Sequence, residues 1–228
     1  MIPLRDDAPR TTTPGVTWFL ILLNTVVFLF EVSLPPGQRE AFLFQFGATP
    51  VYFTHYATPP WPTLITSMFL HGSWLHLIAN MWVLYIFGDN VEDHLGHFRY
   101  LIFYIVCGIG AAGLQIFLAA NSRIPTVGAS GAIAGVMGAY FLLFPSARVL
   151  TLVPFLFIFF MWLPAWIVLG YWFVVQFLSG AATSIAATQA TSGGGGIAFW
   201  AHVGGFGAGL ILAKLLPGRH THLRYSRY

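Results

Sequence analysis

Residues 126–140 read Thr-Val-Gly-Ala-Ser-Gly-Ala-Ile-Ala-Gly-Val-Met-Gly-Ala-Tyr, an apolar stretch with one serine, Ser130, held between Gly128 and Gly131. After the serine, glycines recur at three- and four-residue spacing, so one face of the predicted helix has almost no side-chain volume. In hydrocarbon, a face of this kind allows a second helix to approach backbone to backbone. The stretch therefore predicts a tightly packed pair of membrane helices with a serine at one end.

The candidate partner is the segment 201–209, Ala-His-Val-Gly-Gly-Phe-Gly-Ala-Gly, in which His202, Gly205 and Gly209 share one helical face. Packing the two glycine faces together would bring an imidazole beside the Ser130 hydroxyl, the minimum equipment for nucleophilic catalysis. Glycine-faced helices in membranes often serve packing alone, and serine there often bonds its own backbone. An ionisable histidine is costly in a membrane and favours a functional role.

Composition indicates an integral membrane protein. Of the 228 residues, 57% are hydrophobic and 7% are charged, whereas a soluble domain has about 25% charged residues. The net charge of +3 comes without a basic run, so we expect no nucleic-acid partner. Cys107 is the single cysteine, which excludes an internal disulfide and a cysteine-based metal site.

The apolar pattern predicts an all-α polytopic fold with six transmembrane helices, since a span needs about 20 residues. The runs lie at about 16–34, 63–87, 98–120, 128–145, 149–179 and 197–216. The first run has no cleavage site and is interpreted as a retained anchor. We therefore expect three parts: a mobile cytoplasmic tail 1–15, a membrane domain 16–217 and a cytoplasmic tail 218–228.

Loop charge predicts that both termini are cytoplasmic, because basic residues concentrate on that side of a membrane. The inside segments would hold Arg5, Arg10, Arg99, Arg148, Lys214, Arg219, Arg224 and Arg227, against Arg39 and Arg123 outside. In this topology Ser130 and His202 begin helices that run inward, so both are expected in the outer half of the bilayer. The uncharged loop 180–196 is predicted to be a flexible outer segment that covers the site.

The second run adds His71, His76 and Asn80, of which the last two are four residues apart and share a helical face. One interpretation is that His71, His76 and His202 converge on zinc, but the spacing is unlike an HExxH pair and no carboxylate lies among them. The other is that the Asn80 amide donates to a developing oxyanion. His71 either lines a wet cavity or makes a structural bond to the first loop.

Together these segments resemble the rhomboid family of intramembrane serine proteases. The matching elements are His71, His76 and Asn80; Gly128-Ala-Ser-Gly131; Ala201-His-Val-Gly-Gly205; and Gly88-Asp-Asn-Val-Glu-Asp-His-Leu-Gly96. Two positions depart from the family pattern. Ala134 stands where many members have a tyrosine that stacks on the catalytic imidazole, and the loop 35–62 has no Trp-Arg pair, since Trp61 lies between prolines.

The resemblance implies a serine endopeptidase that cuts transmembrane segments of protein substrates within the lipid bilayer. Ser130 would be the nucleophile and His202 the base, while His76, Asn80 and the Ser130 backbone N–H would form the oxyanion hole. Gly128, Gly131, Gly205 and His71 would support the site. All seven carboxylates lie outside the helix cores, which independently predicts a Ser–His dyad.

We expect no cofactor and no metal, and a multi-pass protein of a bacterial-type cell membrane with its site open to the outer side. Glu92 is expected to bond backbone in the cytoplasmic turn. The oligomeric state is left open. The alternative function is a catalytically inactive rhomboid-like protein that binds transmembrane clients, although both Ser130 and His202 are present. A transporter or channel is less favoured because internal repeats are missing.

Overall fold

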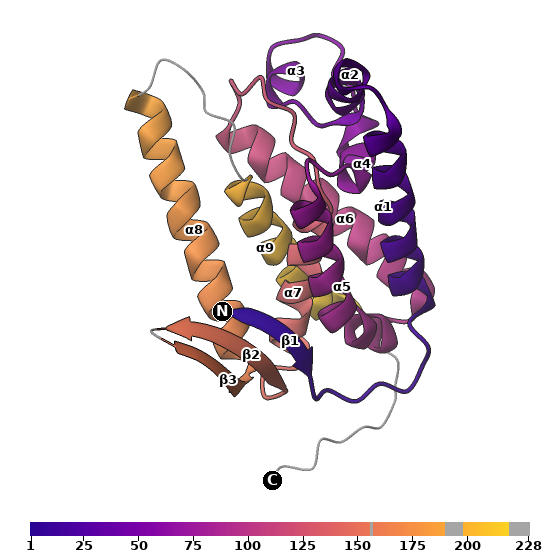
Figure 1. Cartoon of the computed structure of the whole chain (residues 1–228), viewed down its shortest axis with the longest axis vertical. Coiled ribbons are helices and arrows are strands. Elements are labelled where there is room, and N and C mark those ends of the chain that lie inside the picture. The colour runs from indigo at the N-terminus through magenta and orange to yellow at the C-terminus, as the bar shows by residue number, and fades with distance from the viewer. Residues whose placement is uncertain (156, 190–197, 219–228) are drawn as a thin grey trace.

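The computed structural model describes residues 1–155, 157–189 and 198–218. Its helices are α1 (Gly15–Ser33), α2 (Pro36–Phe46), α3 (Pro50–Thr54), α4 (Thr63–Thr66), the 3-10 turn η1 (Ser67–Phe69), α5 (Trp74–Leu95), α6 (His97–Leu118), α7 (Ser130–Leu143), α8 (Ala165–Gln189) and α9 (Phe199–Leu215). Its strands are β1 (Ile2–Asp6), β2 (Arg148–Phe155) and β3 (Phe157–Pro164). Figure 1 shows the helices as a bundle with the strands at one end.

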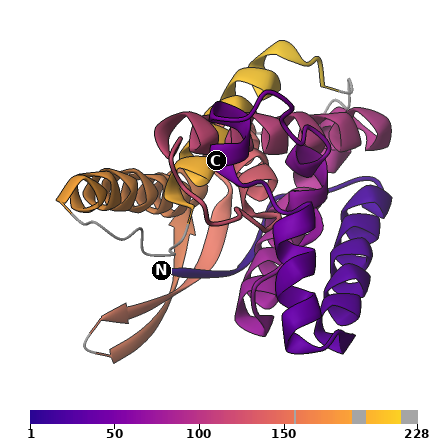
Figure 2. The same cartoon turned by 90° about the horizontal axis from the view of Figure 1, so that it is seen from above.

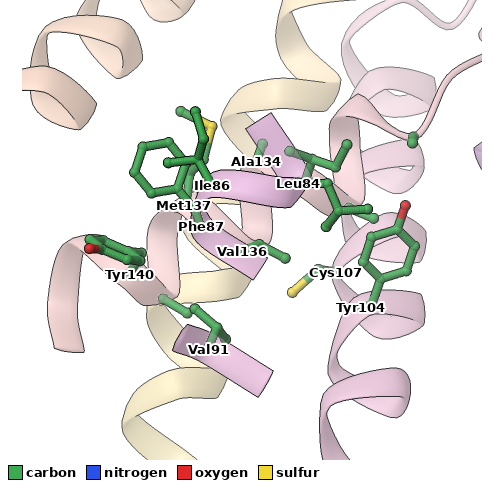
Figure 3. Close-up of a cluster of buried hydrophobic side chains, with 14 of the residues drawn as sticks. Leu84, Ile86, Phe87, Val91, Tyr104, Cys107, Ala134, Val136, Met137 and Tyr140 are labelled. Carbon is green, nitrogen blue, oxygen red and sulfur yellow. The ribbon is translucent and has the colours of Figure 1, made fainter. Parts of the chain in front are cut away.

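Helix α7 is the centre of the bundle, with every residue from Gly131 to Tyr140 buried and contacts to α5, α6, α8 and α9. Small residues allow this, because alanine and glycine let the neighbouring backbones come close. Larger side chains fill the space toward α5 and α6, as Figure 3 shows for Phe87, Cys107 and Val136, all of which are fully buried. This central, buried helix carries Ser130 at its N-terminal end, at the edge of the core.

Contacts between loops that are distant in the sequence show which loops lie at each end of the bundle. At one end the N-terminal segment bonds the α5–α6 turn through Thr11 and Asp93, Arg148 bonds Asp7, and Arg99 donates to the Pro217 carbonyl. At the other end Ala48 pairs with Thr126, and Thr54 donates to the Ala120 carbonyl. The first end thus collects the basic loops that the sequence analysis assigned to the cytoplasm.

The prediction of a single apolar helix over 149–179 is wrong. Residues 148–155 and 157–164 form the antiparallel strands β2 and β3, and the helix begins at Ala165. Figure 2 shows this hairpin projecting from the bundle. Pro154 lies inside the run, where a helix would lose a hydrogen bond and clash with the ring. The surrounding β-branched and aromatic residues fit a strand better than a helix.

The N-terminal segment also differs from the mobile tail that we expected over 1–15. Residues Ile2–Asp6 form β1, which pairs antiparallel with β2 in a sheet of order β1-β2-β3. Two further bonds hold the segment: Trp82 donates to the Pro3 carbonyl, and the Tyr140 hydroxyl donates to Asp6. A strand of this length has no local stabilisation, so its order depends on β2, which is far away in the sequence.

The long loops are more helical than expected. The segment 35–62 contains α2 and α3, and residues 180–189 continue α8, so the predicted flexible loop over 180–196 is wrong for its first half. The rest of that loop, together with the tail 219–228, lies outside the described residues. Among the described helices, three are long and apolar enough to cross a membrane: Gly15–Ser33, His97–Leu118 and Ala165–Ile185. The six-span count is therefore not confirmed.

We predict that Asp6 makes the stability of the protein pH-dependent. Burial, with Asp7 and Asp89 nearby, raises the pKa of Asp6 from 3.8 to about 6. A raised pKa in the folded state means that the neutral carboxyl stabilises the fold below pH ~4, and that this contribution is lost as the pH rises through about 6. Since Asp6 is half-buried, solvent screening reduces the effect to about 2 kcal/mol.

Thermal unfolding in detergent at pH 4 and pH 7 measures this contribution against Asp6→Asn, which cannot titrate. The wild-type protein should lose stability relative to the variant between the two pH values. A constant difference in Tm across this range would show that the Asp6 carboxyl keeps its ordinary pKa in the folded protein.

Candidate active site

Helices α7 and α9 pack backbone to backbone through their glycines, as the sequence analysis predicted. A Cβ atom at Gly205 would overlap the carbonyl of Gly131, and one at Gly209 would overlap the carbonyl of Gly135. Near the top of this contact, a Cβ at Gly131 would lie 3.7 Å from the Ala201 carbonyl oxygen. The two helices therefore meet within one residue of Ser130 and of His202.

The turn that precedes Ser130 passes close to the polar side chains of α5. Gly128 has φ +124°, a conformation that a residue with a side chain rarely adopts. A Cβ at Gly128 would lie 2.7 Å from His76 Nε2 and 3.7 Å from Asn80 Nδ2, so the glycine is also needed for space. The Asn80 side chain is 7% exposed, and its Nδ2 has no hydrogen-bond partner among the described residues.

Two unpartnered features of this turn match the needs of an oxyanion site. The Asn80 amide is buried, aimed at the start of α7 and without an acceptor. The first backbone N–H groups of α7, which include that of Ser130, have no partner within their helix. A developing negative charge between them would receive donors that do not need to reorganise.

The His71 ring packs against the ring of His76. Its side chain is fully buried, and its ring centroid lies 5.1 Å from that of His76. Its backbone is fixed from two sides, because the N–H donates to Glu31 at 3.1 Å and the carbonyl accepts from Arg39 at 3.2 Å. Arg39 belongs to α2, so the structural bond to the first loop is present, on the His71 backbone.

His202 is held by α8, which the sequence analysis did not predict. Its Nδ1–H donates to the side-chain oxygen Oε1 of Gln176 at 2.6 Å. Its ring lies 5.5 Å from the Trp172 ring, with an interplanar angle of 38°. Ala134, the position at which many family members have a tyrosine, is fully buried, and its Cβ would lie 3.3 Å from a Cβ added at Gly205. Trp172 therefore supplies the ring contact that Ala134 cannot.

Ser130 lies at the first position of α7 beside a small cavity of about 20 Å³. The cavity walls come from α6, α7, η1 and the start of α9, including Gly108, Ala111 and Ala201. In the part of the chain that the structure describes, the Ser130 hydroxyl makes no hydrogen bond. The structure thus brings the ends of α7 and α9 together without a bond between Ser130 and His202.

Glu92 has the structural role that we expected, although it bonds a different element. Its carboxylate accepts from the Val16 and Thr17 backbone N–H groups at 2.9 and 2.7 Å, and it pairs with His97 at 2.5 Å. It therefore caps the N-terminus of α1, where a negative charge is favoured by the helix dipole. Gly96, with φ 80°, lets the chain turn between α5 and α6.

The zinc interpretation gains no support from the geometry. Across residues 1–155, 157–189 and 198–218, no group of three or more histidine, cysteine or acidic side chains is arranged to hold a metal ion. The rings of His71 and His76 lie next to each other, but His202 bonds Gln176 and does not join them in a group of three metal ligands.

Comparison with known proteins identifies the family to which these features correspond. The family described as "Rhomboid domain" matches residues 59–219, which is more than half of the chain and contains every residue of the candidate site. The match begins just before α4 and ends just after α9. The N-terminal strand and α1 lie outside it.

Three relatives illustrate the similarity. Rhomboid protease AarA of Providencia stuartii is 34% identical over 140 residues, which is 55% of this chain and 49% of the relative. Putative rhomboid protease YdcA of Bacillus subtilis is 34% identical over 127 residues, covering 56% of this chain and 61% of the relative. Rhomboid-like protein 11, chloroplastic, of Arabidopsis thaliana is 32% identical over 127 residues, covering 56% and 41%.

The matched region thus spans about half the length of the relatives. Together with the apolar helices, the similarity shows a multi-pass integral membrane protein. Because the relatives include a chloroplast protein as well as bacterial ones, the expectation of a bacterial-type cell membrane is not supported.

Proposed function

The chain belongs to the rhomboid family, and from this premise we propose that it is an intramembrane serine endopeptidase that cleaves transmembrane segments of other membrane proteins. The observation that carries the proposal is the convergence of three helices at one point. Ser130 begins α7, His202 lies in the first turns of α9, and Asn80 of α5 points an unpartnered amide at the turn before Ser130.

The proposed reaction is acyl transfer through a Ser–His dyad. The Ser130 Oγ attacks the peptide carbonyl, and the His202 Nε2 takes its proton and then gives it to the leaving amine. The negative charge on the carbonyl oxygen receives donors from Asn80, His76 and the Ser130 N–H. Water then hydrolyses the ester and regenerates the serine. A dyad is favoured because α6, α7, α8 and α9 contain no aspartate or glutamate.

We propose six membrane crossings with both termini cytoplasmic, made by α1, α5, α6, α7, α8 and α9. The pairing of β1 with β2 supports this topology, because it requires the segments before α1 and after α7 to lie on the same side of a membrane. Four crossings separate them, which is an even number. The site would then lie toward the outer face, and substrates would be single-span or other transmembrane proteins that reach it from the lipid.

The first experiment is incubation of the purified protein in detergent with a generic single-span substrate and, separately, with a serine-directed fluorophosphonate probe. We expect a defined cleavage product and covalent labelling of one serine. Labelling without cleavage of any single-span substrate would contradict the endopeptidase activity. Absence of both would favour an inactive protein that binds transmembrane clients.

A second experiment tests the oxyanion role of Asn80. Asn80→Ala should lower kcat by roughly 10²–10³ with little change in KM, because the amide acts on charge that exists only in the transition state. His76→Ala should lower kcat to a similar extent. The fold-decrease in kcat of the double variant should be smaller than the product of the two single fold-decreases. Asn90→Ala is the matched control, since Asn90 lies on the same helix but bonds the Ala8 carbonyl.

Chelation separates this role from metal binding. Full activity after exhaustive dialysis against a chelator, combined with a weak Asn80→Ala variant, supports the oxyanion role. Activity that a chelator removes and zinc restores would instead assign the polar cluster to a metal.

A further inference from the structure

A polar side chain that bonds His202 has no part in the proposed reaction. Gln176 lies near the middle of α8 in an otherwise apolar sequence, Tyr-Trp-Phe-Val-Val-Gln-Phe-Leu at 171–178. A glutamine amide among apolar residues at membrane depth is unfavourable unless it has a partner. Its oxygen accepts from the His202 Nδ1–H at 2.6 Å, a short and specific contact.

The contact fixes which nitrogen of the imidazole carries the proton. A neutral histidine has one N–H and one bare nitrogen, and the partner of the first decides the tautomer. With Oε1 of Gln176 as an acceptor at Nδ1, the proton is held there and Nε2 remains bare. Nε2 is the nitrogen that a base needs in order to take the serine proton.

The same helix fixes the plane of the ring. Trp172 is four residues before Gln176, so both lie on one face of α8. Trp172 contacts the His202 ring at 5.5 Å and also approaches Phe206, one turn further along α9, at 6.3 Å. The imidazole is therefore held by a ring on one side and by an amide at Nδ1.

We propose that Gln176 is the positioning residue of this site: it holds His202 in the tautomer with Nε2 free and orients the ring toward the start of α7. The proposal rests on the proposed function, in which His202 is the base. It assigns to a neutral amide on α8 the orienting task that an acid performs in a catalytic triad. An amide can fix the tautomer, but it brings no charge to stabilise the imidazolium.

The main test compares two glutamines that both bond α9. Gln176→Met removes the acceptor and keeps a side chain of similar size. Gln115→Met is the matched control, because Gln115 accepts from the Ala201 backbone N–H at 3.2 Å and does not bond the imidazole. We expect Gln176→Met to lower kcat by about 10–100-fold, as for loss of an orienting partner of a histidine, with KM unchanged. Gln115→Met should keep kcat within about twofold.

The pH profile distinguishes positioning from a purely structural role. Gln176→Glu keeps an acceptor at Nδ1 and should restore kcat to within about fivefold of the wild type. A carboxylate there also favours the imidazolium, so the acid limb of kcat/KM should move to higher pH by about one unit. His76 of α5 is the other titratable group whose charge reaches His202, and its replacement by glutamine should leave this displacement in place.

The outcomes separate the two proposals. If wild-type protein neither cleaves a substrate nor reacts with the probe, the proposed function fails. If the wild type is active but Gln176→Met keeps full kcat, or Gln176→Glu leaves the acid limb where it was, the positioning role is wrong while the function stands. A loss of kcat in Gln176→Met at unchanged KM and unchanged Tm, with rescue by Gln176→Glu, supports it.

Discussion

Ser130→Ala should abolish both cleavage and fluorophosphonate labelling, with kcat falling on the order of 10⁵-fold or more, as when other serine hydrolases lose their nucleophile. The fold should be unaffected. Within the described residues the Ser130 hydroxyl makes no hydrogen bond, and alanine is well tolerated in a helix. The thermal unfolding midpoint in detergent should therefore stay within about 2 °C of the wild type.

The control for this variant is the other serine of the same cavity, Ser67, which is 5% exposed. Ser67→Ala should be labelled as strongly as the wild type, and mass spectrometry of the labelled peptide should find the adduct on Ser130. Labelling that persists in Ser130→Ala would place the nucleophile elsewhere and end the proposed mechanism.

Gly209→Ala should have the largest effect on stability. Its added methyl group would overlap the carbonyl of Gly135 in α7, and a backbone atom cannot move aside as a side chain can. The two helices would have to separate, and overpacking of this kind costs about 3 kcal/mol. For a chain of this size we expect the unfolding midpoint to fall by about 6–12 °C, with activity lost in parallel.

The matched control is two residues away on the same helix. A Cβ at Gly207 would meet nothing within 4 Å, so Gly207→Ala should leave the midpoint unchanged or raise it slightly, since alanine favours the helix. Equal midpoints for the two variants would mean that the glycine face of α9 is not held against α7.

The helices that form the site could be predicted from sequence because their signals are local. Glycine at three- and four-residue spacing in both α7 and α9 predicted a close contact, and the structure shows it at Gly205 and Gly209. The pair His76 and Asn80 was assigned to one face by spacing alone, and Gly128 confirms that both point the same way. Whether these residues catalyse a reaction remains a prediction.

The hairpin was missed for a physical reason. A continuous apolar run fits a buried helix and a strand equally well, and periodicity cannot separate them. Pro154 and the aromatic content were the available signals. The N-terminal strand had an even weaker local signal, since its partner β2 is about 140 residues away in the sequence. Gln176 could have been suspected, because a glutamine in the apolar middle of a helix indicates an internal partner.

The pairing of β1 with β2 also sets an order of events during synthesis. Residues 2–6 leave the ribosome before the strand that they pair with, which begins at Arg148. At about 5–20 residues per second, the first strand waits roughly 7–28 s for its partner. During that interval the nascent chain presents an unpaired, half-apolar segment, which a protease or a chaperone can reach. Pairing of the two strands therefore requires that α7 has already been synthesised, and a pulse of protease during translation would measure when it occurs.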